Sequence, residues 1–106
     1  MGELITLEDA KSYLRDTPPE DDKFIKDLLI KAARSFCETK LKRPLLAEKM
    51  TDETRWDIPE EVIVAMYMLI AHWYENRGVL GRVEGEIAFS VNALIGPYKF
   101  HSFGGS

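Results

Sequence analysis

The sequence predicts an all-α fold, built from two long antiparallel helices and two shorter helices. Three observations lead to this prediction. Apolar residues recur at helical spacing in two long segments, prolines and glycines separate those segments, and 106 residues are typical of one domain. We therefore expect a single domain over residues 1–106, with a flexible C-terminal tail over residues 97–106.

The first short helix is predicted to begin after Thr6. A threonine side chain caps a helix well, and Asp9 would lie in the first turn, at the positive end of the helix. The apolar residues that follow at helical spacing are Leu7, Ala10, Tyr13 and Leu14. The segment "DTPPEDD" (16–22) then breaks the helix, since its two prolines cannot continue it.

The first long helix is predicted over residues 20–42. One half of its helical wheel is apolar and holds Phe24, Ile25, Leu28, Leu29, Ala32, Ala33 and Phe36. A second, narrower apolar stripe lies outside that half and consists of Ile30, Cys37 and Leu41. The helix is expected to end at Arg43-Pro44. Residues 45–57 have no clear period, so we expect either a loop or a short hairpin there.

The second long helix is predicted to start at Pro59, because proline suits the first turn and Asp57 is close enough to cap it. Gly78 is its expected stop. A wide apolar arc includes Val62, Ile63, Ala65, Met66, Tyr67, Leu69, Ile70, Trp73 and Tyr74. The opposite side carries a further apolar stripe, Val64, Met68 and Ala71, between Glu61 and Glu75.

The segment 79–89 contains two glycines and is expected to form either a loop or a small two-stranded β-ribbon. Ser90 is expected to cap the last short helix, which contains "VNALI", and Gly96-Pro97 to end it. The remaining segment, "YKFHSFGGS", carries three aromatic residues and ends in glycines.

The charge balance argues against a protein that grips nucleic acid. Fourteen Lys and Arg against 18 Asp and Glu give a net charge of −4, whereas phosphate contacts need basic charge. The basic residues form no recognition face, since they gather only weakly, as Lys40, Lys42 and Arg43 and as Arg77 and Arg82. We also expect no membrane span and no secretory signal, and Cys37 is a lone cysteine that fits a reducing compartment.

The segment "AHWYENRG" (71–78) is the most chemically diverse part of the chain. His72 and Glu75 have the i, i+3 spacing of carboxylate-bridged metal sites, but the other histidine, His101, lies in the tail. No phosphate-binding glycine loop, nucleophile elbow or metal-binding pattern occurs. We therefore predict no catalytic residues, no metal site and no cofactor.

The two extra apolar stripes permit two interpretations. Soluble monomers seldom place apolar residues around a whole helix, because leaving them in water forfeits roughly 1.5–3 kcal/mol each. Either the short helices and the 45–57 segment cover the stripes, or other subunits do. Under the second interpretation the candidate subunit-contact residues are Ile30, Cys37, Leu41, Val64, Met68, Ala71 and, at the polar helix end, Arg77.

Four segments in order give the chain its resemblance to a known family. They are "ITLEDAKSYL", "LLIKAARSFCE", "IPEEVIVAMYMLIAHWYENR" and "FSVNALIGPYKF". The proline-started helix that ends in residues 71–77, followed by Phe89-x-Val91-x-Ala93-Leu94-Ile95-x-Pro97-Tyr98, is the most specific part. The chain resembles head–tail connector (adaptor) proteins of tailed bacteriophages and prophages.

The resemblance implies a structural role without catalysis. It implies a homo-oligomeric ring of about twelve subunits below the portal protein, which extends the DNA channel and presents a surface to the next connector or tail protein. DNA would pass through without specific binding, and no membrane would be involved. The protein would be made in the host cytoplasm and end in the virion. The alternative is a small helical DNA-packaging accessory that binds DNA directly.

The aromatic residues Tyr98, Phe100 and Phe103 of the tail are candidates for portal docking, because exposed aromatics suit a peptide that binds a partner's groove. The other interpretation is a frayed terminus whose first aromatic residue folds back on the last helix.

Overall fold

The first helix begins as the sequence predicted. In the computed structural model, which describes residues 3–99, Thr6 caps helix α1, Leu7–Leu14. The Thr6 hydroxyl accepts a hydrogen bond from the Asp9 amide at 3.1 Å, and the Asp9 carboxylate accepts one from the Thr6 amide at 3.2 Å. This reciprocal pair satisfies two amides at the helix end. Residues 15 and 16 then leave the helix with positive φ angles of 66° and 45°.

The first long helix is confirmed, with one irregularity. A 3₁₀ turn, Pro19–Asp21, leads into α2, Asp22–Phe24, then a π-helical turn, Ile25–Leu29, and α3, Ile30–Leu41. A π turn holds one more residue than an α turn and so rotates the preceding residues about the helix axis. Ile25 and Leu29 thereby join the buried side, whereas Leu28 is 48% exposed. The helical wheel placed Leu28 in the core. This prediction was wrong because the buried side is the one that holds Ile30 and Cys37, and Leu28 lies about 200° from Ile30 around the helix.

The segment after α3 is a loop rather than a hairpin. Lys42 ends the helix in the left-handed conformation, with φ of 58°. The Glu38 carboxylate then accepts a hydrogen bond from the Leu45 amide, and Leu45 and Leu46 are buried. A short 3₁₀ turn, Ala47–Lys49, follows, and the Trp56 indole donates to the Pro44 carbonyl at 2.9 Å. The indole bond closes the loop on itself.

The second long helix, α4, Glu60–Glu75, is confirmed, but its ends differ from the prediction. Pro59 is the N-terminal cap residue and no side chain caps the helix, so Asp57 does not have the predicted role. Asn76, not Gly78, ends α4. The asparagine side chain donates a hydrogen bond to the His72 carbonyl at 2.9 Å, which satisfies a free carbonyl at the helix end.

No β-ribbon forms between residues 79 and 89. A 3₁₀ turn, Arg77–Val79, leads into a loop, and helix α5 spans Glu86–Ile95, so the predicted start at Ser90 was one turn late. Ile87, Val91 and Leu94 lie at helical spacing, which favours the earlier start. Gly85, with φ of 73°, supplies the turn into the helix.

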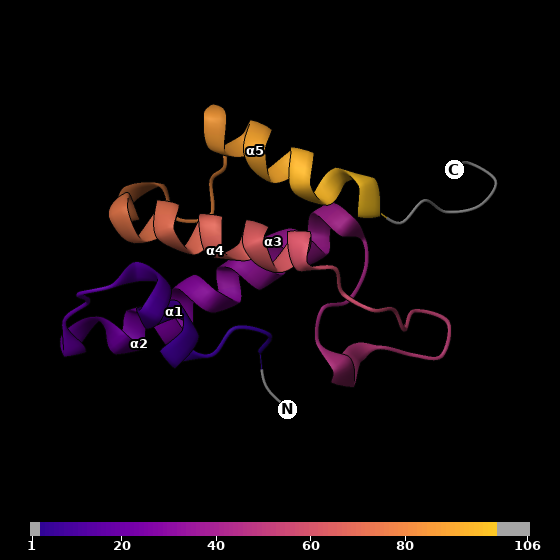
Figure 1. Ribbon diagram of the computed structural model, residues 1–106, viewed down its shortest axis with the longest axis horizontal. Helices are drawn as coiled ribbons and strands as arrows, with labels where there is room; N and C mark the ends of the chain where they lie inside the picture. Colours follow the sequence, from indigo (N-terminus) through magenta and orange to yellow (C-terminus); the bar gives the residue numbers. More distant parts are fainter. Residues whose placement is uncertain (1–2, 100–106) are drawn as a thin grey trace.

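Helix α4 is the centre of the molecule. It packs against α1, α3 and α5, and the two long helices run in opposite directions, as do α4 and α5 (Figure 1). The core lies between these helices and consists of Ile5, Ala10, Ile25, Leu29, Ile30, Ala33, Cys37, Leu41, Leu45, Val62, Ala65, Met66, Leu69, Ile70, Trp73, Val91 and Ile95. The prediction of an all-α fold with two long antiparallel helices is confirmed.

Candidate functional site

The segment 71–78 forms the contact between the C-terminal end of α4 and the start of the first long helix. Trp73 is fully buried and its indole donates to the Arg82 carbonyl at 2.9 Å, which anchors the following loop. The Tyr74 hydroxyl donates to the Asp21 carboxylate at 2.6 Å, and the Arg77 guanidinium donates to the same oxygen at 2.9 Å. Arg77 also lies 4.4 Å above the Phe24 ring.

Both members of the Tyr74–Asp21 pair have shifted pKa values. The hydrogen bond from Tyr74 lowers the pKa of Asp21, and Arg77 lowers it further through its hydrogen bond and positive charge, against the opposing effect of desolvation. The same hydrogen bond raises the pKa of Tyr74, because its hydroxyl must lose the proton that it donates. This cluster joins two helices within one subunit, which is a structural role.

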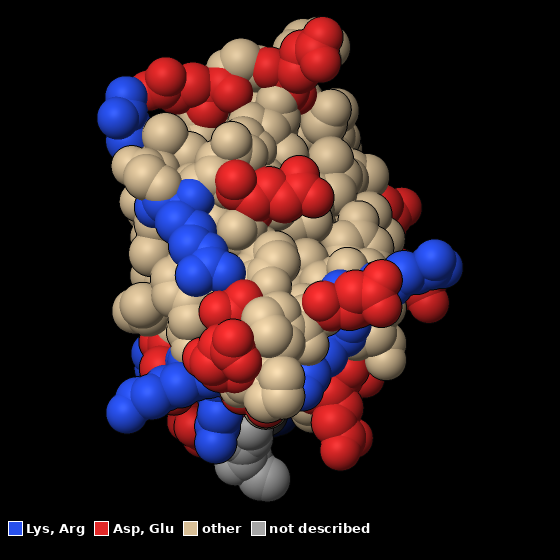
Figure 2. All heavy atoms as spheres, turned by 90° about the vertical axis from the view of Figure 1, so that its left-hand side faces the viewer, with Lys and Arg blue, Asp and Glu red and all other residues tan. Residues whose placement is uncertain are grey.

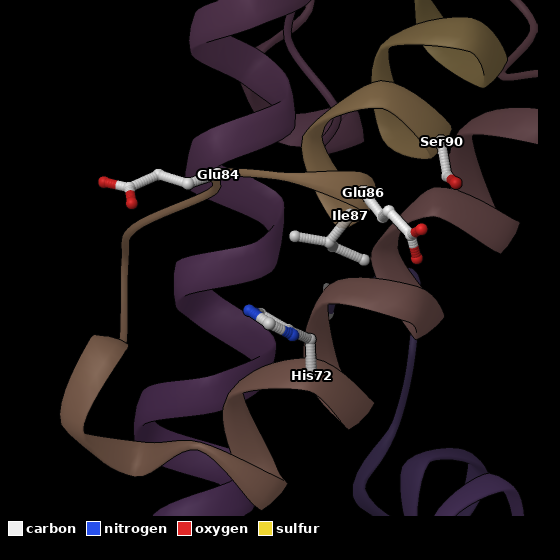
Figure 3. Close-up of a pocket in the computed structure, with 5 residues that line it drawn as sticks. All are labelled: His72, Glu84, Glu86, Ile87 and Ser90. Atoms are coloured by element: carbon white, nitrogen blue, oxygen red, sulfur yellow. The ribbon is translucent and has the colours of Figure 1, made fainter.

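His72 lines an open hollow of about 430 Å³ with Glu84, Glu86, Ile87 and Ser90. Figure 3 shows His72 and Ile87 facing the hollow, while the carboxylates of Glu84 and Glu86 point in opposite directions. Within residues 3–99, no group of three or more ligand side chains is placed to hold a metal ion. The hollow therefore lacks the convergent polar groups of a binding site.

The charged residues do not form a basic face at the end of the molecule that holds the start of α2 and the C-terminal end of α4. Figure 2 shows acidic and basic side chains interspersed there. Arg77 pairs with Asp21, and Arg82 pairs with Glu84 at 3.2 Å. These pairs neutralise the two arginines that the sequence places beside the glycine loop.

The stripe on the first long helix belongs to the core. Ile30, Cys37 and Leu41 are 1%, 0% and 0% exposed within the single subunit, so they have no surface for a neighbouring chain. Of the two interpretations of this stripe, its burial supports coverage within the subunit, because α3 packs this side against α4. Burial, with the nearby negative charge of Glu38, raises the pKa of the Cys37 thiol to about 12.

The stripe on the second long helix lies at the surface. Val64 is 46% exposed, and Met68 and Ala71 are partly exposed. Beside Val64, Tyr67 packs against Tyr13 of α1, with ring centroids 4.8 Å apart. Val64, Met68 and Ala71 are called the α4 stripe below. Together with Arg77, whose side chain is 48% exposed, they are the predicted contact residues that keep surface available to a partner.

Sequence reasoning missed two exposed apolar residues. Leu28 was assigned to the core, and Phe89, at 81% exposure, received no role. The sequence offered two apolar sides on this helix and did not mark the side of Ile30 and Cys37 as the buried one. Phe89 could have been found by starting α5 at Glu86, which puts Phe89 on the side of the helix away from Val91.

Comparison with known protein families shows to which family the chain belongs. Residues 4–99 match the model of the Phage gp6-like head-tail connector protein family. The chain belongs to this family. A search of curated proteins and a search of solved structures give no match. The head–tail connector family is structural, so this connector is not an enzyme.

Membership places the connector at the junction of a phage head and its tail, where it assembles with portal and tail proteins. No helix within the described residues is long and apolar enough to cross a membrane.

The predicted portal-docking residues of the connector fall into two groups. Tyr98 belongs to a 3₁₀ turn, Gly96–Tyr98, and packs against the core. Desolvation, together with the charge and hydrogen bond of Glu61, raises the pKa of its hydroxyl. Residues 97 and 98, which the prediction included in the flexible tail, therefore belong to this turn. Phe100 and Phe103 lie outside the described residues.

Proposed function

We propose that this connector forms a homo-oligomeric ring of about twelve copies below the portal protein, extends the DNA channel and docks the next connector or tail protein. The α4 stripe is the observation that supports this proposal. A subunit whose core is already complete exposes Val64 and part of Met68 on a long helix. Apolar surface of this kind marks a protein interface.

The charge of the connector fits a channel protein. The net charge of −4 gives an overall repulsion of DNA phosphates, and a wall that repels DNA lets it pass without holding it. Family membership adds the position between head and tail.

The experiment is electron microscopy of the purified connector, alone and mixed with portal-bearing capsids, with light scattering of the same samples. Closed rings, or a ring-shaped addition below the portal, are the expected result. A connector that stays monomeric in both samples would overturn the proposal.

A DNA-packaging accessory is the alternative, and a gel-shift assay separates the two. A ring protein that only surrounds DNA gives no shift as a free subunit, whereas direct binding gives a shift that weakens as salt increases. The paired arginines Arg77 and Arg82 and the mixed charge in Figure 2 favour the ring.

We further propose that the residues after Lys99 dock the connector on the portal through Phe100 and Phe103, with Tyr98 as the anchor on the subunit. Deletion of residues 100–106 tests this, since it keeps the Tyr98 contacts with the core. The expected protein keeps its helical content and melting temperature but leaves heads without tails. Normal assembly of the shortened protein would contradict docking by the tail.

A further inference from the structure

The α4 stripe has a matching surface elsewhere on the same subunit. We propose that, in the ring, the α4 stripe of one subunit packs against the Leu28 side of the next subunit's first long helix. This inference rests on the proposed ring and specifies its interface as head-to-tail. The Leu28 side is defined here by Leu28 with its neighbours at helical spacing, Phe24 and Ala32.

The two surfaces face different directions, so they cannot cover each other within one subunit. Val64 precedes Trp73 by nine residues, which places it half a turn away around α4. Trp73 contacts Phe36 of α3 edge-on, with centroids 6.3 Å apart, so Val64 faces away from α3. The side of the first long helix that α4 covers is the buried side, and Leu28 lies outside it.

The most exposed residues of the two surfaces have similar exposure. Val64 is 46% exposed and Leu28 is 48% exposed. Both lie on long helices, and long helices can pack along several turns. Two different apolar surfaces on one chain are what a heterologous contact requires, and repeated heterologous contacts form a ring when the rotation between neighbours closes.

The charges at the edges of the surfaces are complementary. Helix α4 carries three glutamates and no lysine or arginine, and Glu60 and Glu75 flank the stripe without an ion pair in the described structure. Lys23 and Lys31 flank Leu28, and neither makes an ion pair among residues 3–99. Asp27 lies between these two lysines, so the Leu28 edge keeps a net positive charge. Complementary edges favour one orientation of the contact and suppress the wrong ones.

Cysteine cross-linking of the assembled ring tests the pairing. A chain that carries both Leu28→Cys and Met68→Cys should, on mild oxidation, give a ladder of covalent oligomers up to the full ring. Each single variant should give no such ladder, because a heterologous contact brings residue 28 of one subunit to residue 68 of the next. Cys37 does not interfere, since it is fully buried.

The matched control replaces Leu28→Cys with Phe89→Cys in the same Met68→Cys chain. Phe89 is more exposed than Leu28, so random collisions would link it at least as often. Three results would overturn the inference: no ladder from rings that are visible by electron microscopy, an equal ladder from the control, or efficient dimers from Met68→Cys alone. In all three, visible rings keep the proposed function intact. A connector that never forms rings overturns both.

Charge reversal gives a second readout. Lys31→Glu and Glu75→Lys should each lower the yield of rings at low salt, and the chain with both changes should recover it. Lys26→Glu is the control, because Lys26 is exposed on the same helix but points away from Leu28. Equal loss with Lys26→Glu, or no recovery in the doubly changed chain, would contradict the pairing.

Discussion

Two apolar stripes that look alike in the sequence have opposite positions in the structure. The stripe of Ile30, Cys37 and Leu41, called the α3 stripe below, lies in the core, whereas the α4 stripe lies at the surface. Both were identified as the extra apolar residues of a long amphipathic helix. The difference shows that such a stripe does not by itself mark an interface, because the coverage by neighbouring elements decides its role.

The largest expected effect of a substitution is in the α3 stripe. Ile30→Glu should unfold the subunit, since removing a carboxylate from water at a 1% exposed position costs several kcal/mol, a large part of a typical total stability of about 5–15 kcal/mol. Circular dichroism with thermal melting measures this. A folded Ile30→Glu protein would show that Ile30 does not belong to the core and would contradict the contrast between the two stripes.

Substitution by alanine should lower the free energy of unfolding more in the α3 stripe than in the α4 stripe. Leu41→Ala leaves a cavity at a fully buried site and should cost about 2–5 kcal/mol. Val64→Ala removes two methyl groups from a half-exposed site and should change stability by about 0.5 kcal/mol. Chemical denaturation of the monomeric proteins provides both values, and similar losses would show that Val64 supports the core.

Met68→Glu should leave the subunit folded and abolish assembly. The side chain is partly exposed in the subunit, so water can reach the new carboxylate, but a neighbouring subunit would bury it unpaired. Thermal melting checks the fold, and light scattering checks the ring. An unfolded Met68→Glu protein would place the α4 stripe in the core after all.

Thiol labelling should distinguish the stripes without changing stability. Cys37 is fully buried and its pKa is about 12, so it should not react with a thiol reagent at pH 8 until the protein unfolds. A cysteine at position 68 in the Met68→Cys variant should react in the folded subunit. Protection of this cysteine on assembly would further assign the stripe to an interface.

The smallest expected effect concerns the cluster that fixes the start of the first long helix to the end of α4. Because Asp21 has a lowered pKa in the folded state, its contribution to stability is present above the unfolded value of 3.8 and is lost as the pH falls through the folded value. Asp21→Asn should therefore lower the melting temperature at pH 7, and the difference should shrink as the pH falls below 3.8. A difference that persists at pH 2 would contradict the assignment.

Much of the fold could be predicted because the signals are local. The capping box at Thr6 and Asp9, the prolines at residues 18 and 19, and Pro59 act on the residues beside them. The segment 79–89 was harder, since its glycines fit both a loop and a ribbon. The indole of Trp73 on α4 donates a hydrogen bond to the Arg82 carbonyl and so holds this segment as a loop. Local sequence does not reveal this contact between two elements.

The candidate site was only partly predictable. Val64 remains exposed and Met68 and Ala71 remain partly exposed, as an interface requires, because the subunit covers that side of α4 only in part. Leu28 was missed, since the sequence offered two apolar sides on this helix and only the packing of α4 decides which one is buried. Arg77 was recognised as notable, but its binding to Asp21, 56 residues earlier, could not be derived from spacing.

By itself, the sequence determined the helical class, the approximate extents of the long helices and the family, because these depend on residue order and short-range periodicity. Only the tertiary structure decided which apolar stripe is buried. The reason is physical: burial depends on whether a neighbouring element removes a side from water, and a helical wheel contains no neighbours. The packing of α3 against α4 supplied that information: it buries the α3 stripe, whereas the α4 stripe keeps exposed surface.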